Sequence, residues 1–200
     1  MRPDLELIAG LVPSGARVLD VGCGDGALLH HLSRNRGCRV QGVERDPDAL
    51  IACMRRGIPV LEVDADKGLA DFGDGAFDVV VLSQTLQALH RPREVLREIV
   101  RVGAVGIVSF PNFGHWRVRL QLLARGRMPV SRTLPHPWHS TPNLHLCTIV
   151  DFEETARREG IEILQRRALD PRGLPANGPV VRHPNLLAAG AAYLIRRRAR

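Results

Sequence analysis

The sequence predicts an α/β protein with a doubly wound, mostly parallel sheet. Between residues 16 and 110, short runs rich in Val and Ile alternate with segments whose apolar residues recur at helical spacing. The runs are apolar almost throughout, as expected of strands covered on both faces. Helical connections between successive strands make those strands parallel. With 200 residues and 44% hydrophobic residues, the chain is expected to form a single domain over residues 1–200.

The strands are expected at residues 16–21, 38–44, 58–63, 77–83 and 105–110, and the helices between them at 26–37, 46–57 and 91–103. The helix at 46–57 has both ends marked, by Asp46 as N-cap, by Pro47 in the first turn and by Gly57 just past the end. The third crossover, residues 64–76, shows no helical period. Its acids Asp66, Asp71 and Asp74 are interpreted as solvated loop residues.

The alternation of strand-type and helix-type segments stops after Phe110, and residues 111–150 are interpreted as a lid or acceptor-side insertion. A helix over 114–127 would place Trp116, Leu120 and Leu123 on one stripe. Residues 128–148 contain four prolines and three histidines without a period, which predicts a long loop. A helix at 151–160 and a strand at 161–169 follow. The run 185–198 fits a helix or a final strand, of which the strand is preferred, and residues 196–200 are interpreted as a basic tail.

Composition excludes several classes of protein. No apolar run approaches the roughly 20 residues that cross a bilayer, so a cytoplasmic protein without membrane contact is expected. The net charge is +7, but no aromatic residues interleave with the carboxyl-terminal arginines, which disfavours nucleic-acid binding. The four cysteines form no C-x-x-C and are expected to be reduced, mostly buried thiols. His136, His139, His145 and Cys147 match no standard zinc spacing, so no metal is predicted.

The stretch "VLDVGCGDG" places an acid and three glycines at the end of the first strand. A glycine-rich turn there allows a ligand to approach the backbone. The order Asp20, Gly22, Gly24, Gly26 differs from the dinucleotide fingerprint G-x-G-x-x-G. A carboxylate at this point would repel a phosphate by about 4 kcal/mol per charge pair at 4 Å and attract an ammonium. The turn therefore favours a ligand with a cationic tail.

A nucleoside carrying a cationic tail describes S-adenosylmethionine. Glu44 ends the second strand, 18 residues past Gly26, close to the spacing at which an acid binds ribose hydroxyls in nucleotide folds. Asp64 ends the third strand and is predicted to accept from the adenine amino group, while the Ala65 N–H meets a ring nitrogen. Ser83 and Gln84 follow the fourth strand at the mouth of the same cleft.

The segments "VLDVGCGDG", "GVERD" and "RPREVLREIVRV" resemble the class I S-adenosylmethionine-dependent methyltransferase fold. The segments "SFPNFGHWRVRLQLLARGRMPV" and "PWHSTPNLHLCTIVDFEETARREG" resemble the MetW family of methionine biosynthesis proteins. The resemblance covers roughly residues 5–196. It implies a Rossmann-like seven-stranded sheet with an antiparallel last strand, a cofactor pocket at the carboxyl ends of the first strands, and a homoserine O-acyltransferase as partner.

The methyl acceptor is not predicted by any motif. Asn112, His115, Trp116, Trp138 and His145 are the candidate substrate-binding residues, with core packing the alternative for the tryptophans and His145. No catalytic base is assigned, and none is required, because methyl transfer from a sulfonium is an in-line displacement that needs alignment and exclusion of water. The leading hypothesis is a methyltransferase, and the second is a non-catalytic subunit that senses S-adenosylmethionine and modulates the acyltransferase. A third, an NAD-dependent oxidoreductase, is disfavoured because Asp20 would repel a pyrophosphate.

Overall fold

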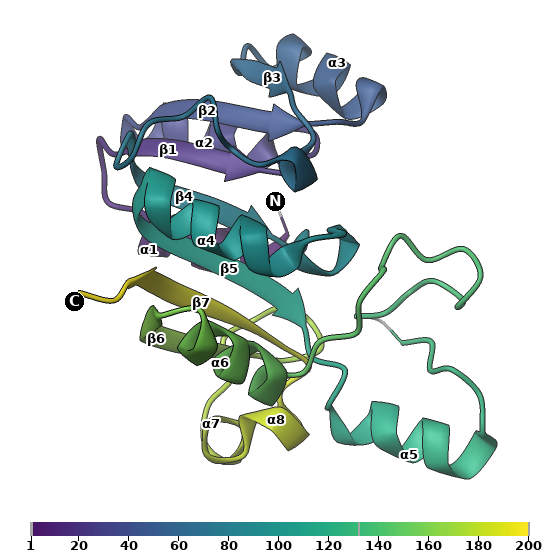
Figure 1. Ribbon diagram of the computed structural model, residues 1–200. Coiled ribbons are helices and arrows are strands. Elements are labelled where there is room, and N and C mark those ends of the chain that lie inside the picture. The colour runs from purple at the N-terminus through teal and green to yellow at the C-terminus, as the bar shows by residue number, and fades with distance from the viewer. Residues whose placement is uncertain (1, 132, 200) are drawn as a thin grey trace.

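The computed structural model describes residues 2–131 and 133–199, and its centre is a seven-stranded sheet in the order β3-β2-β1-β4-β5-β7-β6 (Figure 1). β7 pairs antiparallel with both β5 and β6, whereas every other pairing is parallel. The predicted fold class and the preference for a final strand are confirmed. The strands are β1 Arg17–Val21, β2 Arg39–Glu44, β3 Val60–Glu62, β4 Phe77–Ser83, β5 Gly103–Pro111, β6 Ile161–Leu169 and β7 Gly190–Arg197.

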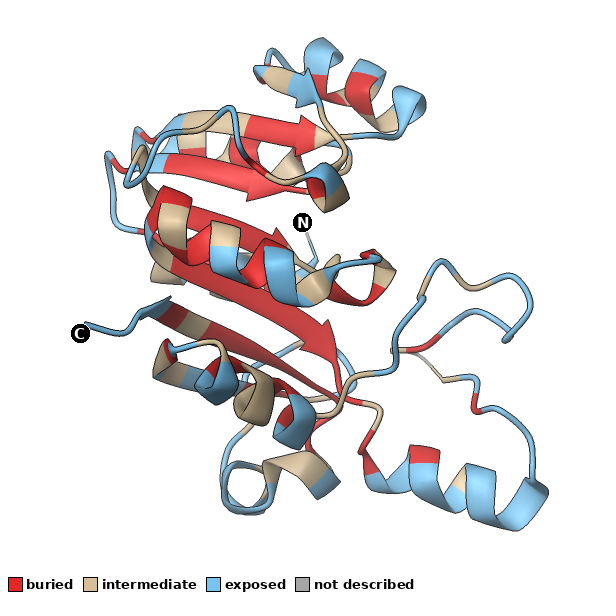
Figure 2. Ribbon diagram, in the orientation of Figure 1, coloured by how far each residue is buried: buried red, intermediate tan, exposed pale blue. Residues whose placement is uncertain are grey.

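The helices cover the two faces of the sheet in separate groups. α4 and α6 pack with one core cluster, while α1, α2 and α3 pack with a second cluster on the opposite face. The central strands β1, β4, β5 and β7 are buried over most of their length, whereas β2, β3 and β6 are buried only in part or not at all (Figure 2). The helices are α1 Pro3–Leu11, α2 Ala27–Arg36, α3 Pro47–Arg55, α4 Pro92–Val102, α5 Trp116–Arg125, α6 Ile149–Arg158, α7 Pro179–Arg182 and α8 Pro184–Leu187, with short 3-10 helices η1 Ala65–Lys67 and η2 Leu86–Ala88.

Local sequence signals account for the helix ends. The Asp46 carboxylate accepts from the Asp48 and Ala49 amides, so the predicted N-cap of α3 is confirmed. Thr148 and Asp151 form a reciprocal capping box at the start of α6. α1 lies before the first expected strand, in a region for which the sequence analysis made no prediction.

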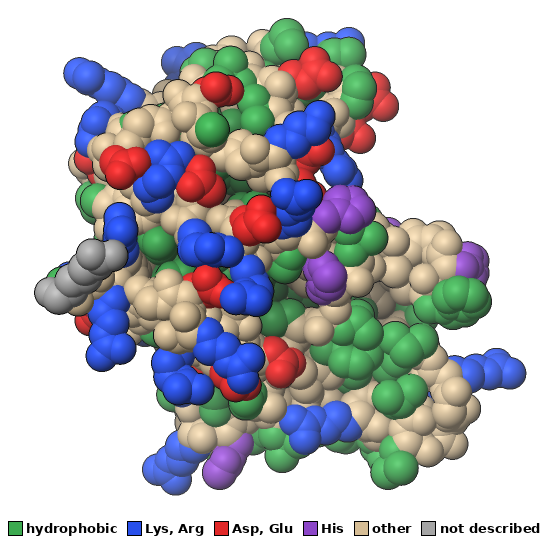
Figure 3. All heavy atoms as spheres, in the orientation of Figure 1, with side chains coloured by type: hydrophobic (Ala, Val, Ile, Leu, Met, Phe, Trp, Pro, Cys, Tyr) green, Lys and Arg blue, Asp and Glu red, His purple; other side chains and the backbone are tan. Residues whose placement is uncertain are grey.

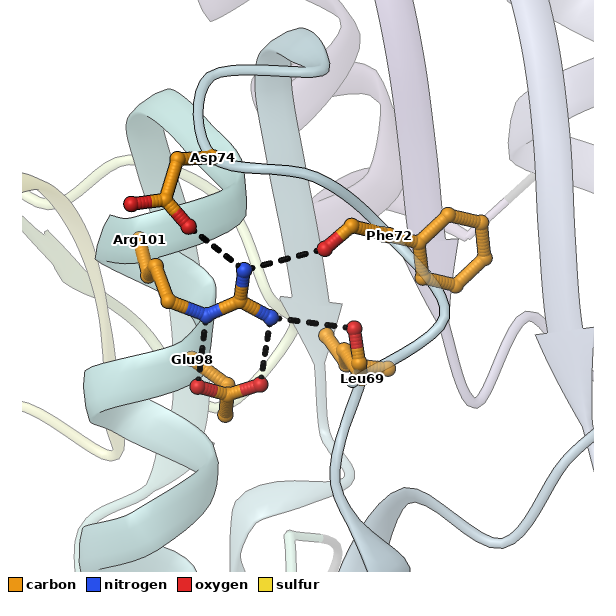
Figure 4. Close-up of polar contacts among 5 residues, drawn as sticks. All are labelled: Leu69, Phe72, Asp74, Glu98 and Arg101. Atoms are coloured by element: carbon orange, nitrogen blue, oxygen red, sulfur yellow. Dashed lines mark hydrogen bonds and ion pairs between the residues drawn. The ribbon is translucent and has the colours of Figure 1, made fainter.

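The irregular crossover after β3 is held to α4 by Arg101 (Figure 4). Its guanidinium forms a bidentate pair with Glu98, at 2.8 and 2.7 Å, and donates to the Asp74 carboxylate at 2.7 Å. It also donates to the carbonyls of Leu69 and Phe72. These bonds fix the segment that leads from η1 to β4, although the segment has little secondary structure of its own.

Asp71 and Asp74 are exposed, as expected of solvated loop acids, and Asp66 is half-buried; two of the three acids also form bonds that the sequence did not predict. Asp74 is paired with Arg101, as described above. Asp66 accepts from the backbone amides of His90 and Arg91, at 3.0 and 2.8 Å, and so joins η1 to the start of α4. Both acids therefore help to position the segment that follows β3.

The insertion after β5 consists of α5 and an irregular segment, as predicted. The expected apolar stripe of α5 does not pack into the core, however: only Val118 of this helix is buried, and Trp116, Leu120 and Leu123 are exposed (Figure 2). At the carboxyl terminus, β7 includes Arg196 and Arg197, so the expected tail begins two residues later, and Arg200 lies outside the described residues. Among the described residues, no helix is both long and apolar enough to cross a membrane.

Candidate cofactor cleft and adjoining cavity

The turn after β1 requires glycine for two reasons: its backbone has positive φ values, and at two positions there is no room for a Cβ atom. Gly22, Gly24 and Gly26 have φ values of 72°, 56° and 72°, in the left-handed region that other residues rarely adopt. A Cβ atom on Gly22 would lie 2.6 Å from the Thr85 hydroxyl oxygen, and one on Gly26 would lie 2.9 Å from the Cys53 sulfur. The turn is thus packed against the segment after β4 on one side and against α3 on the other.

The amide groups of this turn are already used inside the chain. The N–H groups of Gly22 and Cys23 donate to the Val43 carbonyl, at 2.8 and 3.2 Å. The Gly24 N–H donates to the Glu44 carboxylate at 2.9 Å. A phosphate-binding turn keeps such amides free for the ligand. The turn is therefore not built as a phosphate cradle, in agreement with the argument from the charge of Asp20.

Glu44 at the end of β2 is oriented by three backbone donors. Its Oε2 accepts from Gly24, and its Oε1 accepts from Arg45 and Asp46 at 2.8 and 3.1 Å. A carboxylate offers about four lone-pair sites, so about one acceptor site, on Oε2, remains after these three bonds. The carboxylate is fixed in place before any ligand arrives, which suits an acceptor for hydroxyl groups.

Asp20 lies beneath the turn and has no partner for one of its oxygens. The residue is 3% exposed, and its Oδ1 has no hydrogen-bond partner among the described residues. Burial, followed by the proximity of the Glu44 carboxylate, raises the pKa of Asp20 to about 7, with Arg2 acting in the opposite direction. A buried carboxylate without a counter-charge is costly. A cationic ligand would supply the positive charge that this carboxylate lacks.

A narrow cleft runs from this turn along the carboxyl ends of β1, β2 and β3, where the strand order reverses between β1 and β4. Asp64 caps η1 by accepting from the Asp66 amide at 3.1 Å, and Ala65 is buried beside it. Ala88 and Leu89 form an apolar wall suited to a flat ring. The cleft is lined by Gly22, Val43, Glu44, Arg45, Val63, Asp64, Ala65, Asp66, Thr85, Ala88 and Leu89.

Four of the predicted cofactor residues, Gly22, Glu44, Asp64 and Ala65, are thus brought together at the cleft. The other five predicted residues do not line the cleft: Asp20, Gly24 and Gly26 belong to the end of β1 and the turn beside it, and Ser83 and Gln84 lie elsewhere, with the Ser83 hydroxyl 3.2 Å from that of Ser109. Gln84 has a φ of 55°, a strained value for a residue other than glycine, and lines a second cavity. Thr85, which lines the cleft and touches the glycine turn, was missed by the sequence analysis.

The second cavity, of about 460 Å³, lies where β4, β5 and β6 end and β7 begins. Gln87 is the most deeply buried polar side chain in its lining, at 3% exposure, and its Oε1 has no hydrogen-bond partner among the described residues. Sequence reasoning missed Gln87, since only its place in η2 turns it inward. The lining also includes charged and polar residues, among them Arg2, Asp4, Gln84, Thr133, His136, Asn143, Asp170 and Arg172.

None of the five predicted acceptor residues lines this cavity. Asn112 is buried and its amide is fully engaged, donating to the carbonyls of Asn185 and Ala188 and accepting from Gly114. His115 caps α5 through Nδ1, and burial, followed by Arg117, lowers its pKa. Trp116, Trp138 and His145 are exposed, so they belong neither to the core nor to the cavity.

The remaining candidate chemistry concerns thiols and metals. All four cysteines are free; Cys23, Cys38 and Cys53 are buried and Cys147 is half-buried, as expected from the sequence. Within residues 2–131 and 133–199, no group of three or more His, Cys, Asp or Glu side chains is arranged to hold a metal ion. The histidines of the long loop do not converge with Cys147.

The fold is that of the class I S-adenosylmethionine-dependent methyltransferases. A solved S-adenosylmethionine-dependent methyltransferase of Thermotoga maritima, described as a possible histamine N-methyltransferase, has a TM-score of 0.67 at 17% identity, over 98% of this chain and 88% of that one. A second, from Mesorhizobium loti, has a TM-score of 0.69 at 18% identity, over 96% of both chains. At these identities the likeness establishes the fold alone.

The family described as "Methionine biosynthesis protein MetW" matches residues 2–195, and the chain belongs to it. A bifunctional methionine biosynthesis protein MetXA/MetW of Rhodopirellula baltica is 39% identical over 160 residues, which are 76% of this chain and 26% of that protein. A ubiquinone biosynthesis O-methyltransferase of Ralstonia nicotianae is 30% identical over 174 residues, which are 83% of this chain and 71% of that enzyme. The chain thus spans about a quarter of the bifunctional relative.

Proposed function

We propose that this protein binds S-adenosylmethionine in the narrow cleft and acts as a methyltransferase-like protein of methionine biosynthesis. The observation that carries the proposal is the buried, unpartnered carboxylate of Asp20 beside a glycine turn whose amides are already occupied. Asp20 would face the ammonium, Glu44 the ribose, and Asp64 with Ala65 the adenine. When bound, S-adenosylmethionine supplies an electrophilic methyl group on a sulfonium. The cytoplasmic location expected from the sequence stays a prediction.

Binding of S-adenosylmethionine should strengthen as the pH rises from 5.5 to 7, by about tenfold. The ammonium attracts only ionised Asp20, whose pKa near 7 leaves the group mostly protonated at pH 5.5. Free amino groups stay protonated across this window, so the ligand's own charge is constant. Titration calorimetry at a series of pH values measures the effect. An Asp20→Asn variant should give a flat profile, and a flat profile for the wild type would contradict the role of Asp20.

We assign the second cavity to the methyl acceptor. The segment 84–88 separates it from the cleft: Gln84 and Gln87 line the cavity, and Thr85 and Ala88 line the cleft. The unpartnered Oε1 of Gln87 requires a hydrogen-bond donor, which an acceptor hydroxyl or amine provides. The surrounding residues would orient the acceptor and exclude water. Orientation and exclusion of water are the main ways in which a protein accelerates methyl transfer.

A Gln87→Leu variant should lower methyl transfer at least tenfold while leaving the affinity for S-adenosylmethionine unchanged. Leucine fills a similar volume and removes a buried oxygen that has no partner among the described residues, so the variant is expected to fold. Purified protein is incubated with methyl-labelled S-adenosylmethionine and extract of the source organism, and the labelled product is quantified. Equal labelling by wild type and variant would remove Gln87 from the acceptor site.

A second function is favoured by the relative in which a MetXA region and a MetW region form one chain. In this alternative the protein is a regulatory subunit of homoserine O-acyltransferase, and its cleft senses S-adenosylmethionine without transferring the methyl group. Linkage between ligand and partner requires only that the two bind with coupled affinities. Binding of S-adenosylmethionine with no label in any component of the extract, together with a complex with the acyltransferase, would support this function over methyl transfer.

A further inference from the structure

The outward face of α5 carries an apolar stripe. Trp116, Leu120 and Leu123 are 41%, 52% and 85% exposed, whereas Val118 on the opposite side of the helix is 3% exposed. The spacing i, i+4, i+7 places these three side chains in one row. An amphipathic helix normally turns such a row toward its own core. Here the row faces solvent, in the arrangement by which a helix enters the groove of a partner.

The stripe continues onto neighbouring segments. Apolar side chains gather beside α5 in the lower right of Figure 3. Together with the stripe they form what we call the α5 surface, and a gathered apolar patch of this kind marks a candidate interaction site. Its further members are Met128, Val130, Trp138, Leu144, Leu146 and Val150, each 40% or more exposed.

The charge of this region is one-sided. No Asp or Glu occurs between Glu98 and Asp151, and residues 112–147 include five arginines. The Arg117 guanidinium lies 5.3 Å from the centre of the Trp116 ring, directly at the stripe. A complementary partner must present an apolar groove with acidic residues around it. Two copies of this chain would bring arginines against arginines, which disfavours a symmetric dimer through this surface.

We propose that the α5 surface docks onto homoserine O-acyltransferase, with the stripe of α5 seated in an apolar groove bordered by acids. The inference rests on the partnership proposed above. In one relative, a MetXA region and a MetW region belong to the same chain, and such a link keeps two regions at high effective concentration. This relative is the observation that favours the acyltransferase over other partners. None of the residues of the α5 surface lines the cofactor cleft.

The test compares two matched double variants of the full chain. Leu120→Asp with Leu123→Asp places charges on the stripe, and Ile51→Asp with Met54→Asp makes the same change on α3, where these residues are 46% and 62% exposed. Both pairs are spaced i, i+3 on a helix. Binding to purified homoserine O-acyltransferase of the same organism is measured by calorimetry, with S-adenosylmethionine affinity as the control for folding.

The α5 variant should weaken acyltransferase binding at least about thirtyfold, the loss expected at an interface hot spot, while the α3 variant leaves it unchanged. Binding by the wild type should also weaken as NaCl is raised, because the arginines face acids. Equal binding by the wild type and the α5 variant would overturn the docking surface and leave the partnership intact. No binding by the wild type would overturn the partnership itself. Two other outcomes would also overturn the proposal, each with acyltransferase binding unchanged. If the wild type forms a dimer that only the α5 variant loses, the surface binds a second copy of the chain. If the wild type sediments with anionic phospholipid vesicles and only the α5 variant does not, the surface binds a membrane.

Discussion

Asp20→Asn should make the protein more stable at pH 8 and at the same time weaken S-adenosylmethionine binding by about 10- to 100-fold. The loss of affinity follows from removing a charged partner of the ammonium, since a hydrogen bond between charged groups contributes about 1.5–3 kcal/mol. The gain in stability follows from the burial that raises the pKa of Asp20 from 3.8 to about 7. That shift corresponds to a cost of up to about 4 kcal/mol for holding the ionised carboxylate in the folded state.

The gain depends on pH in a defined direction. Below pH 4 the carboxyl group is protonated in both the folded and the unfolded chain, so wild type and variant should be equally stable. Between pH 4 and 7 the unfolded chain releases the proton first, and the wild type loses stability relative to the variant. Above pH 7 the difference is constant. Urea unfolding at several pH values, with ligand titration in parallel, measures both effects.

Asp25→Asn is the matched control for this variant. Asp25 lies in the same turn, but its side chain is 54% exposed and paired with Arg56. Its removal should change stability by less than about 1 kcal/mol, the range for surface ion pairs, and leave S-adenosylmethionine affinity nearly unchanged. Equal effects of the two variants would show that net charge, rather than the buried position of Asp20, controls binding.

Gly22→Ala should destabilise the protein by about 2–5 kcal/mol and abolish measurable S-adenosylmethionine binding. The added Cβ meets the Thr85 side chain at 2.6 Å, and the backbone φ of 72° is unfavourable for alanine. The first effect resembles overpacking, at about 1–3 kcal/mol, and the second costs about 1–2 kcal/mol. Because Gly22 and Thr85 both line the cleft, the shift that relieves the clash also deforms the binding site.

Two further variants separate these causes. Gly24→Ala has a similar φ of 56° but nothing within 4 Å of the new Cβ, so it should cost only about 1–2 kcal/mol. Adding Thr85→Ala to Gly22→Ala removes the two closest atoms and leaves the Thr85 Cβ at 3.2 Å, which should recover part of the stability. If Gly24→Ala proved as harmful as Gly22→Ala, backbone strain alone would explain the loss and the packing argument would be wrong.

The sheet and much of the cofactor cleft could be predicted because their signals are local. Runs such as "FDVVVLS" coincide with strand β4, and the Asp46 cap fixes the start of α3. The glycines of "VGCGDG" report directly on φ, since only glycine adopts such values easily. Glu44 and Asp64 were found because parallel strands end at one edge of the sheet, so the ends of β2 and β3 meet there.

Residues that depend on tertiary contacts were not found from the sequence. The stripe of α5 has the spacing of a buried face, and no local signal shows that it faces outward. Asn112 resembles a substrate ligand in sequence, but its amide joins β5 to the segments around Asn185 and Ala188, more than 70 residues later. Gln87 was missed because what distinguishes it is a buried Oε1 atom without a hydrogen-bond partner among the described residues, and only the folded structure shows this.

The internally satisfied amides of the glycine turn have a consequence for selectivity among metabolites. ATP carries the same adenosine as S-adenosylmethionine but ends in phosphates, which seek free N–H donors. In this turn the donors of Gly22, Cys23 and Gly24 already point at Val43 and Glu44, and Asp20 repels negative charge. If the cleft binds S-adenosylmethionine as proposed, we expect the turn to distinguish the two adenosine compounds by their tails rather than by the base, so that ATP shows little displacement in a competition assay.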